Sequence, residues 1–486
     1  MASPNFVVIV TDDQGAWARG RLMPELVSPV LDELGATGLE LENFFCASPV
    51  CSPARASLLT GRMPSAHGVH DWLRSENSGV SSVGKHYLDG LATTPEVLAA
   101  NGYACGHSGK WHLGDARVPA PGFTRWYSHR DGGGHYFGAP MVEDGREHIE
   151  PAYVTDAITS RAVAMVEELA RGTAPFYVQV HYTAPHTPWH AQEHPDELLD
   201  LYRDTDFPSI PREPTHPWFR RDDGELRAAQ DDDPVSALRG YCAAISGVDR
   251  GVGQLLASLE RAGRREDTYV LFLSDNGFSC GHHGYWGKGN GTWPTNLWDP
   301  SIRVPFIINR PGVVRPRLDA ALTSAAALHP TILELAGVPT PHDSLAAGES
   351  FAARVTGACV DAGTVDGLVV YDEYGGTRMI RTRTHKLVVR REGPDELYDL
   401  VLDPGERDNL LGDPGNHEVE SDLRGRLESW FTAHSTPDRD AFATPVQGFG
   451  QDQPVWAADV SERYVAAPGP ATVPGRGLPA TAAGRE

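Results

Sequence analysis

Three runs of apolar residues, each ending in polar side chains, constrain the fold of this 486-residue chain most strongly. Residues 5–11 end at Asp12-Asp13, residues 268–274 at Asp275-Asn276-Gly277, and residues 176–182 at Thr183-Ala184-Pro185-His186. Near-continuous apolar runs are typical of strands buried on both faces of a parallel sheet. Helical patterns at residues 95–101, 155–170 and 238–262 lie between them. The chain is therefore predicted to be α/β, with a large, mostly parallel sheet flanked by helices.

A change of pattern near residue 366 predicts a second, smaller unit. Short β-prone runs at residues 367–372, 377–382, 386–390 and 396–400 favour a small antiparallel sheet, and residues 421–434 have a helical pattern. We therefore expect a catalytic α/β domain over residues 1–365, a C-terminal subdomain over residues 366–465, and a disordered tail over residues 466–486. Residues 190–235 are rich in charge and proline, and are expected to run irregularly over the surface and border the active site.

Composition narrows the partners and the compartment. A net charge of −23 argues against nucleic acid or an anionic membrane as the main partner. No secretory signal and no window of transmembrane length is seen, and the six cysteines are scattered without a CxxC pair. Few, scattered cysteines fit the reducing environment of the cytosol, so the protein is predicted to be cytoplasmic. A bridge between Cys46 and Cys51 is conceivable, but it would consume the thiol considered next. The sequence does not indicate an oligomeric state.

Residues 49–61 place a thiol beside the start of a helix. Ser52 is a favourable N-cap and Pro53 suits the first helical position, so Cys51 is predicted to lie just ahead of the helix. Arg55 follows one turn later on the same side. A helix N-terminus and a planar cation both favour an anion, so the segment predicts a site for a tetrahedral oxyanion such as sulfate or phosphate. The alternative is a buried thiol beside a helix cap.

Four oxygen-bearing side chains follow two of the predicted buried strands: Asp12, Asp13, Asp275 and Asn276. Ligands bind beyond the carboxyl ends of the strands in such sheets. Oxygen donors favour Ca²⁺ or Mg²⁺, with Mn²⁺ as a third choice. The alternative is that these residues are strand-ending turns, where they are common. Carboxylates crowded together are costly without a cation, which favours the metal site.

Residues 51–55, Cys-Ser-Pro-Ala-Arg, resemble the Cys-x-Pro-x-Arg signature of the type I, formylglycine-dependent sulfatases of the alkaline phosphatase superfamily. Residues 102–114 are similar to the second signature of that family, although Cys105 stands where Ser or Thr is usual. Residues 287–290 and 301–305 resemble its late lysine segment, and residues 378–382 and 396–404 its C-terminal subdomain. These similarities keep their order from residue 5 to about residue 411.

The resemblance implies that a formylglycine-generating enzyme oxidises Cys51 to Cα-formylglycine, whose hydrate attacks sulfur. It implies one divalent ion, most often calcium, held by residue 51 with Asp12, Asp13, Asp275 and Asn276. It also implies catalytic roles for further side chains. Arg55, Lys110 and Lys288 would hold the sulfate group. His186 would protonate the leaving alcohol with the help of Lys288. His112 would assist release of sulfate.

The expected function is therefore hydrolysis of a small-molecule or carbohydrate sulfate ester to an alcohol and inorganic sulfate. One alternative is a phosphonate monoester or phosphodiester hydrolase with the same nucleophile. Another is a non-catalytic protein that binds a sulfated ligand, although none of the chemical residues is missing here. Residues 129–137, Trp189, Asn290 and Trp293 are candidates for lining the pocket. His181, His190, His282 and His283 are easily confused with the active histidines, and His282 and His283 are further candidates for contact with substrate.

Overall fold

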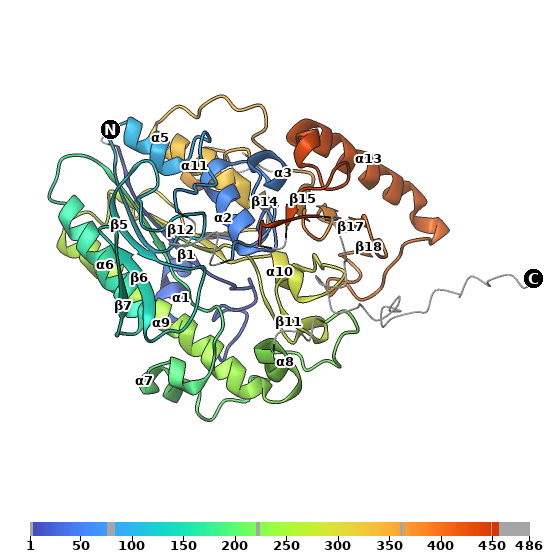
Figure 1. The fold of residues 1–486 in the computed structure, drawn as a ribbon, viewed down its shortest axis with the longest axis horizontal. Coiled ribbons are helices and arrows are strands. Elements are labelled where there is room, and N and C mark those ends of the chain that lie inside the picture. The colour runs from blue at the N-terminus through green and yellow to red at the C-terminus, as the bar shows by residue number, and fades with distance from the viewer. Residues whose placement is uncertain are drawn as a thin grey trace, which may run out of the picture.

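The computed structural model describes residues 3–74, 83–219, 224–359, 363, 365–448 and 450–455. The predicted tail over residues 466–486 lies outside the described residues, as do residues 456–465 of the predicted C-terminal subdomain. Figure 1 shows a large sheet covered by helices on both faces, with a smaller unit of strands and one long helix beside it.

Among the described residues, ten strands form one sheet in the order β13-β2-β12-β9-β1-β8-β4-β5-β6-β7. The five central strands, from β9 to β5, are parallel, whereas β12, β6 and β7 introduce antiparallel pairs. The prediction of a mostly parallel sheet is confirmed. The three apolar runs are its centre: β1 (Asn5–Thr11), β9 (Thr268–Ser274) and β8 (Phe176–His181). The other strands are β2 (Leu39–Leu41), β4 (Ala104–Lys110), β5 (Phe123–His129), β6 (Ala139–Glu143), β7 (Arg146–Glu150), β12 (Phe306–Asn309) and β13 (Arg317–Asp319).

Successive residues of β1 pack into two different hydrophobic layers. Phe6, Val8 and Val10 contact the layer formed with α2 (Cys51–Thr60), α5 (Thr94–Ala100) and α11 (Leu328–Ala336). Val7 and Ile9 belong to the opposite layer, with α1 (Pro29–Ala36), α6 (Val154–Leu169) and α9 (Pro234–Arg261). Because side chains alternate across a strand, burial of both faces explains why the run is apolar without interruption.

The C-terminal strands form the predicted antiparallel sheet, in the order β15-β16-β17-β18. Their bounds are Leu368–Asp372, Thr377–Arg381, His385–Arg390 and Glu396–Asp399. Helix α13 (His417–His434) covers this sheet through Leu423, Leu427 and Phe431 (Figure 1). The domain boundary at residue 365 stays a prediction.

Residues 190–235 differ from the irregular surface segment that was expected. They contain α7 (Asp196–Leu199), α8 (Gly224–Asp231) and the start of α9, and Leu198, Tyr202 and Phe207 are buried in the core. A few large apolar side chains anchor the segment, and their spacing is too irregular to show as periodicity. Shorter elements are α3 (Pro64–His67), α10 (Asp299–Ile302), α12 (Ala352–Thr356) and the strand pairs β3–β14 (Phe44–Phe45, Thr323–Ser324), β10–β11 (Ser279–Cys280, Trp286–Gly287) and β19–β20 (Gln447–Gly448, Gln453–Pro454).

Two further findings on the described residues concern membrane spans and disulfides. None of the helices in this part of the chain combines the length and the apolar character needed to cross a membrane. All six cysteines are described and none forms a disulfide, so the conceivable Cys46–Cys51 bridge is absent.

Gly109 allows β4 and β8 to approach closely just before Lys110. A Cβ atom at Gly109 would lie 1.9 Å from the carbonyl oxygen of His181, and Gly109 has a φ of +115°. We expect Gly109→Ala to lower the free energy of unfolding by about 3 kcal/mol or more. Gly102→Ala is the matched control, because Gly102 also has a positive φ of +88° but no atom within 4 Å of the new Cβ. It should cost only about 1 kcal/mol. Urea denaturation measures both, and equal losses would contradict the close approach.

Candidate active site

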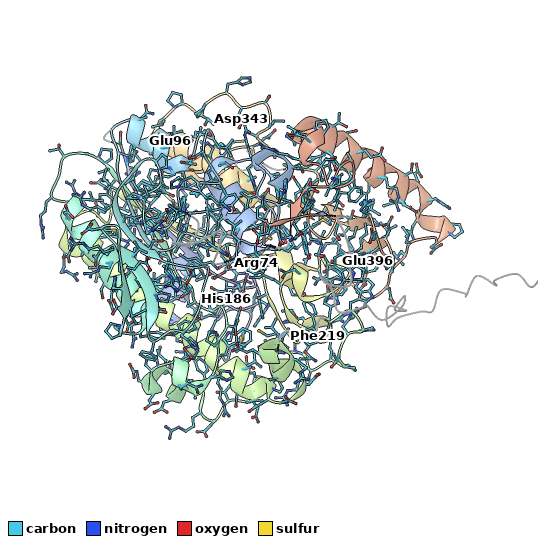
Figure 2. All side chains as sticks on the ribbon, in the orientation of Figure 1. Arg74, Glu96, His186, Phe219, Asp343 and Glu396 are labelled. Carbon is cyan, nitrogen blue, oxygen red and sulfur yellow. The ribbon has the colours of Figure 1, made fainter. Side chains whose placement is uncertain are left out.

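The polar residues that follow the central strands meet at one edge of the sheet. Asp12 and Asp13 follow β1, Asp275 and Asn276 follow β9, and Lys110 is the last residue of β4. Parallel strands bring their carboxyl ends to the same edge, which is where ligands bind in such sheets. His186, which follows β8, lies near the centre of the view in Figure 2.

Cys51 is the first residue of α2, and Val50 is the N-cap. The prediction that Ser52 caps the helix and Pro53 starts it is therefore wrong. The hydroxyl of Ser52 instead accepts a hydrogen bond from the backbone N–H of Leu73 at 3.0 Å, and this tertiary contact replaces the cap. Cys51 is only 2% exposed. Its Sγ lies 3.3 Å from Asp12 Oδ1 and 2.7 Å from Lys288 Nζ.

Three buried carboxylates are paired with three cations around Cys51. The distances are 2.5 Å from Lys110 Nζ to Asp12 Oδ2, 2.7 Å from Lys288 Nζ to Asp13 Oδ1, and 2.9 Å from Arg55 Nη2 to Asp275 Oδ2. This arrangement leaves no net charge among the six groups. It satisfies the rule that buried charges are paired.

Burial and neighbouring charges act in opposite directions on these groups. Burial alone would raise the pKa of Asp12, but Lys110, His186, Arg55 and Lys288 together hold that pKa well below its usual value. Burial, and then the neighbouring Asp12 carboxylate, raises the pKa of Asp275 to about 7. Burial and Asp12 also raise the pKa of the Cys51 thiol. A thiol held in its protonated form is a poor nucleophile.

Arg55 lies beneath the site rather than on the cavity wall. Its Nε donates to Asp275 Oδ2 at 2.9 Å and its Nη1 donates to the Lys110 carbonyl at 3.2 Å. Nη1 also lies 3.2 Å from His181 Nδ1, and a guanidinium only donates, so the imidazole Nδ1 accepts. His181 is thus a supporting residue that sequence reasoning set aside among nearby histidines, although its place at the end of an apolar run marked it.

One ring nitrogen of His112 is hydrogen-bonded to the backbone, and the other has no hydrogen-bond partner among the described residues. Nε2 lies 2.6 Å from the carbonyl oxygen of Leu73, which only accepts, so Nε2 carries the proton. Nδ1 is buried and has no hydrogen-bond partner among the described residues. Burial, and then Lys110, lowers the pKa of His112 well below its usual value, so the ring is neutral. Nδ1 therefore offers a lone pair.

His186 lines the cavity and is held from its other side. Its Nδ1 donates to the carbonyl oxygen of Thr187 at 2.8 Å, and its Nε2 lies 3.7 Å from Asp13 Oδ2. The glycine-rich residues 131–134, predicted to line the pocket, pack against both histidines. A Cβ atom at Gly132 would lie 2.3 Å from His112 Nε2, and one at Gly133 would lie 3.5 Å from His186 Nδ1.

These side chains surround a cavity of about 260 Å³. Its polar wall is formed by predicted site residues: Asp13, Cys51, Lys110, His112, His186 and Lys288. Trp72, Leu226 and Phe278 add apolar area that sequence reasoning did not identify, and Asn290 joins them as anticipated. Trp189 packs instead against Tyr241, Phe278 and Trp286, and Trp293 against a separate cluster around Tyr374. Only the place of Phe278 directly after Asn276-Gly277 hinted at its role.

The donor atoms at the strand ends fit a hard divalent cation. One ligand atom each from Asp12, Cys51 and Asp275 lies within 4.8 Å of the others. The amide of Asn276 donates from Nδ2 to Asp13 Oδ1 at 2.7 Å and to the Gly277 carbonyl at 2.9 Å. This fixes its orientation and leaves the buried Oδ1 without a hydrogen-bond partner among the described residues. Carboxylate and amide oxygens are the ligands that Ca²⁺ and Mg²⁺ prefer.

Comparison with known proteins gives consistent matches. Residues 4–338 match the sequence model "Sulfatase", and residues 281–432 match "N-sulphoglucosamine sulphohydrolase, C-terminal". N-acetylglucosamine-6-O-sulfatase from Bacteroides thetaiotaomicron is 25% identical, over 90% of this chain and 88% of that protein. The crystal structure of the putative sulfatase yidJ from Bacteroides fragilis superimposes with a TM-score of 0.76 at 23% identity, covering 91% of this chain and 97% of that one.

A phosphonate monoester hydrolase of Agrobacterium radiobacter shares the fold, with a TM-score of 0.70 at 19% identity over 89% of this chain and 96% of that chain. The fold alone therefore does not separate the two chemistries. The sulfatase model, which spans residues 4–338, and the sulfatase relatives support hydrolysis of sulfate esters. The chain belongs to the sulfatase family of the alkaline phosphatase superfamily and is a sulfuric ester hydrolase.

Proposed function

We propose that this enzyme hydrolyses the sulfate ester of a carbohydrate or small alcohol through formylglycine formed from Cys51. The position of Cys51 carries the proposal. Its Sγ lies at the cavity, between the Asp12 carboxylate at 3.3 Å and the Lys288 ammonium at 2.7 Å. A carbohydrate ester is favoured because a relative of nearly full coverage is an N-acetylglucosamine-6-O-sulfatase.

The proposed reaction also needs formylglycine at residue 51 and a divalent metal ion. When present, a formylglycine hydrate supplies a nucleophilic hydroxyl with a second hydroxyl for release of sulfate, and a divalent ion supplies Lewis acidity. We assign the ion to residue 51 with Asp12, Asp13, Asp275 and Asn276, and propose Ca²⁺, with Mg²⁺ or Mn²⁺ as the alternatives. A formylglycine-generating enzyme would be the partner during maturation.

Lys110 and Lys288 line the cavity, so we assign them to the sulfate oxygens. Both ammonium groups are held by carboxylates, and fixed cations stabilise developing charge without reorganisation. Arg55 was expected to contact sulfate as well. Because its hydrogen bonds go to Asp275, the Lys110 carbonyl and His181, we assign it to orienting Asp275 instead.

We assign a different proton transfer to each of the two histidines. Because Nδ1 of His186 donates to Thr187, only the imidazolium form, with a second proton on Nε2, can act as the acid; Asp13 Oδ2, 3.7 Å from Nε2, favours that form. Nε2 gives this proton to the ester oxygen as the bond from that oxygen to sulfur breaks, which leaves the ring neutral. His112 presents the lone pair of Nδ1, and we assign it to accepting a hydrogen bond or a proton from a hydroxyl at residue 51. In each histidine the proposed role uses the ring nitrogen that is not hydrogen-bonded to a backbone carbonyl: Nε2 of His186 and Nδ1 of His112.

The modification at residue 51 is tested directly by mass spectrometry of the peptide that spans it. Protein purified from its native host is expected to carry the aldehyde or its hydrate at this position. Protein made without a maturing enzyme should carry the thiol and show little activity, because the buried thiol is protonated. An unmodified thiol in fully active native protein would rule out formylglycine.

The choice between sulfate and phosphorus chemistry is tested by a panel of esters. An aryl sulfate or a sugar sulfate, a phosphonate monoester and a phosphodiester are compared by kcat/KM with fully converted enzyme. We expect the sulfate ester to be the best substrate, since the C-terminal match is to a sulphohydrolase. A higher kcat/KM for the phosphonate monoester would transfer the assignment to that alternative.

A further inference from the structure

A second polar cavity, of about 290 Å³, lies where the sheet domain meets the C-terminal strands. Trp17 lines this cavity and donates its indole N–H to the carbonyl oxygen of Phe278 at 2.8 Å. Phe278 in turn lines the catalytic cavity. The two cavities are therefore neighbours with separate walls. Arg303, Arg381 and His282 line the second one, which we call the junction cavity.

The junction cavity carries an excess of positive charge in a strongly acidic protein. Lys386 and Arg381 share Asp299, at 2.7 Å and 3.2 Å, and Lys386 also pairs with Glu406. Arg407 pairs with Glu213. Among the residues that line the cavity, three cations thus face two carboxylates: Arg303, Arg381 and Arg407 against Asp299 and Glu406. One positive charge is not balanced within this group.

Three groups in the junction cavity have polar atoms without partners. The guanidinium of Arg303 makes no hydrogen bond or ion pair that involves the described residues. Arg381 is 8% exposed, and its Nε has no hydrogen-bond partner in the same part of the chain. His282 Nδ1 is likewise buried without one. Because buried polar atoms are normally hydrogen-bonded, the unpartnered Nε of Arg381 and Nδ1 of His282, beside the half-buried guanidinium of Arg303, indicate that a polar group binds in this cavity.

The electrostatic environment agrees with this interpretation. Burial, and then the charge of Arg407, lowers the pKa of His282 to about 4, so the ring is neutral and adds no charge of its own. Arg381 is fixed by Asp299 and by Phe45, whose ring centre lies 4.8 Å from the guanidinium carbon. A guanidinium that is already ordered loses little freedom when it binds an oxyanion.

We propose that the junction cavity binds a sulfate-type oxyanion between Arg303 and Arg381. Planar guanidinium groups match the oxygen geometry of sulfate, and a sulfate ester group carries the single negative charge that balances the cavity. The oxyanion is either a second sulfate group on a bound substrate or free inorganic sulfate. The proposal does not depend on formylglycine, on the divalent ion or on the roles assigned to the two active-site histidines.

The site is tested by isothermal titration of sodium sulfate into metal-loaded enzyme at constant ionic strength. We expect the wild-type chain to bind two ions, one in each cavity. Arg303→Gln should lose one of them, whereas Lys110→Met should lose the other. Arg315→Gln is the matched control, because Arg315 is an exposed arginine close by in sequence and should leave both ions bound. The proposal is overturned if Arg303→Gln binds as many ions as the control.

Kinetics then separate the two sources of the oxyanion. If the site holds a second sulfate of the substrate, Arg303→Gln should raise KM for a disulfated saccharide about tenfold, with kcat and the KM for a monosulfated ester unchanged. If it holds inorganic sulfate, both KM values stay the same while the titration still loses one ion.

If the glutamine variant does not fold, Arg303→Lys retains the charge without the planar fork and should weaken binding of that ion. Unchanged binding by Arg303→Lys, with both ions at wild-type affinity, would also overturn the proposal. Loss of all hydrolysis of sulfate esters by the wild type would count against the proposed function, not against this site.

Discussion

Cys51→Ser is expected to reduce multiple turnover of sulfate esters by about 10³-fold or more. A serine hydroxyl at the start of α2 would keep its place beside Asp12 and Lys288. It can attack sulfur, and His186 can still protonate the departing alcohol. It has no second hydroxyl, however, so no proton loss at this residue can expel sulfate. The variant should release about one alcohol per chain and then stop.

Burst kinetics and mass spectrometry measure this outcome together. The peptide spanning residue 51 should gain the mass of one sulfuryl group after the burst, and the far-UV spectrum should match that of the wild type. Cys105→Ser is the matched control: Cys105 is also buried, in β4, where its Sγ donates to the Pro95 carbonyl at 3.5 Å. The control should retain turnover. Multiple turnover by Cys51→Ser at the wild-type rate would contradict the formylglycine route.

The centre of the sheet was predictable because burial on both faces leaves a strong signal. The bounds predicted for β1 and β9 agree with the structure, and β8 is one residue shorter than expected. The residues after these strands could then be placed together by topology alone, since parallel strands share one carboxyl edge. Asp12 and Asp275 needed no knowledge of side-chain contacts to be brought to one place, whereas Lys110 was assigned through the resemblance because β4 was not predicted.

Contacts between distant residues could not be predicted in the same way. The start of α2 was misplaced because the hydroxyl of Ser52 binds the backbone of Leu73, 21 residues away. Helical spacing placed Arg55 on the side of the anion site, but it could not show that Asp275, 220 residues later, takes the guanidinium. Local sequence records propensity, whereas these choices are made by tertiary partners.

The apolar wall of the catalytic cavity was missed for a related reason. Leu226 lines the cavity from α8, in a stretch whose neighbours are mostly charged or small. One apolar side chain gives no periodicity, so the segment appeared irregular. Trp72 also lines the cavity. Neither Leu226 nor Trp72 belongs to a recognisable motif, so the sequence indicated the chemistry more clearly than the alcohol.

The balance of buried charge connects the metal to the substrate. When Asp275 is ionised, three carboxylates and three cations cancel around residue 51, so a divalent ion would then leave two positive charges at the cavity. This excess matches the two negative charges of the sulfate product. Replacing one carboxylate by an amide would raise the positive charge further and exchange an anionic oxygen ligand for a neutral one. The metal should then bind less tightly, because its own ligand charge has fallen.

Asp13→Asn is therefore expected to weaken calcium binding by at least about tenfold and to lower kcat/KM at limiting calcium by about 10²-fold. Asparagine suits the left-handed backbone of Asp13, whose φ is 66°, so the fold should persist. Calcium should raise the melting temperature of the wild type, and a chelator should abolish both this rise and the activity. Asp144→Asn is the control, since Asp144 has a φ of 50° in an exposed turn. A calcium-induced rise in Asp13→Asn equal to that of the control would place the ion elsewhere.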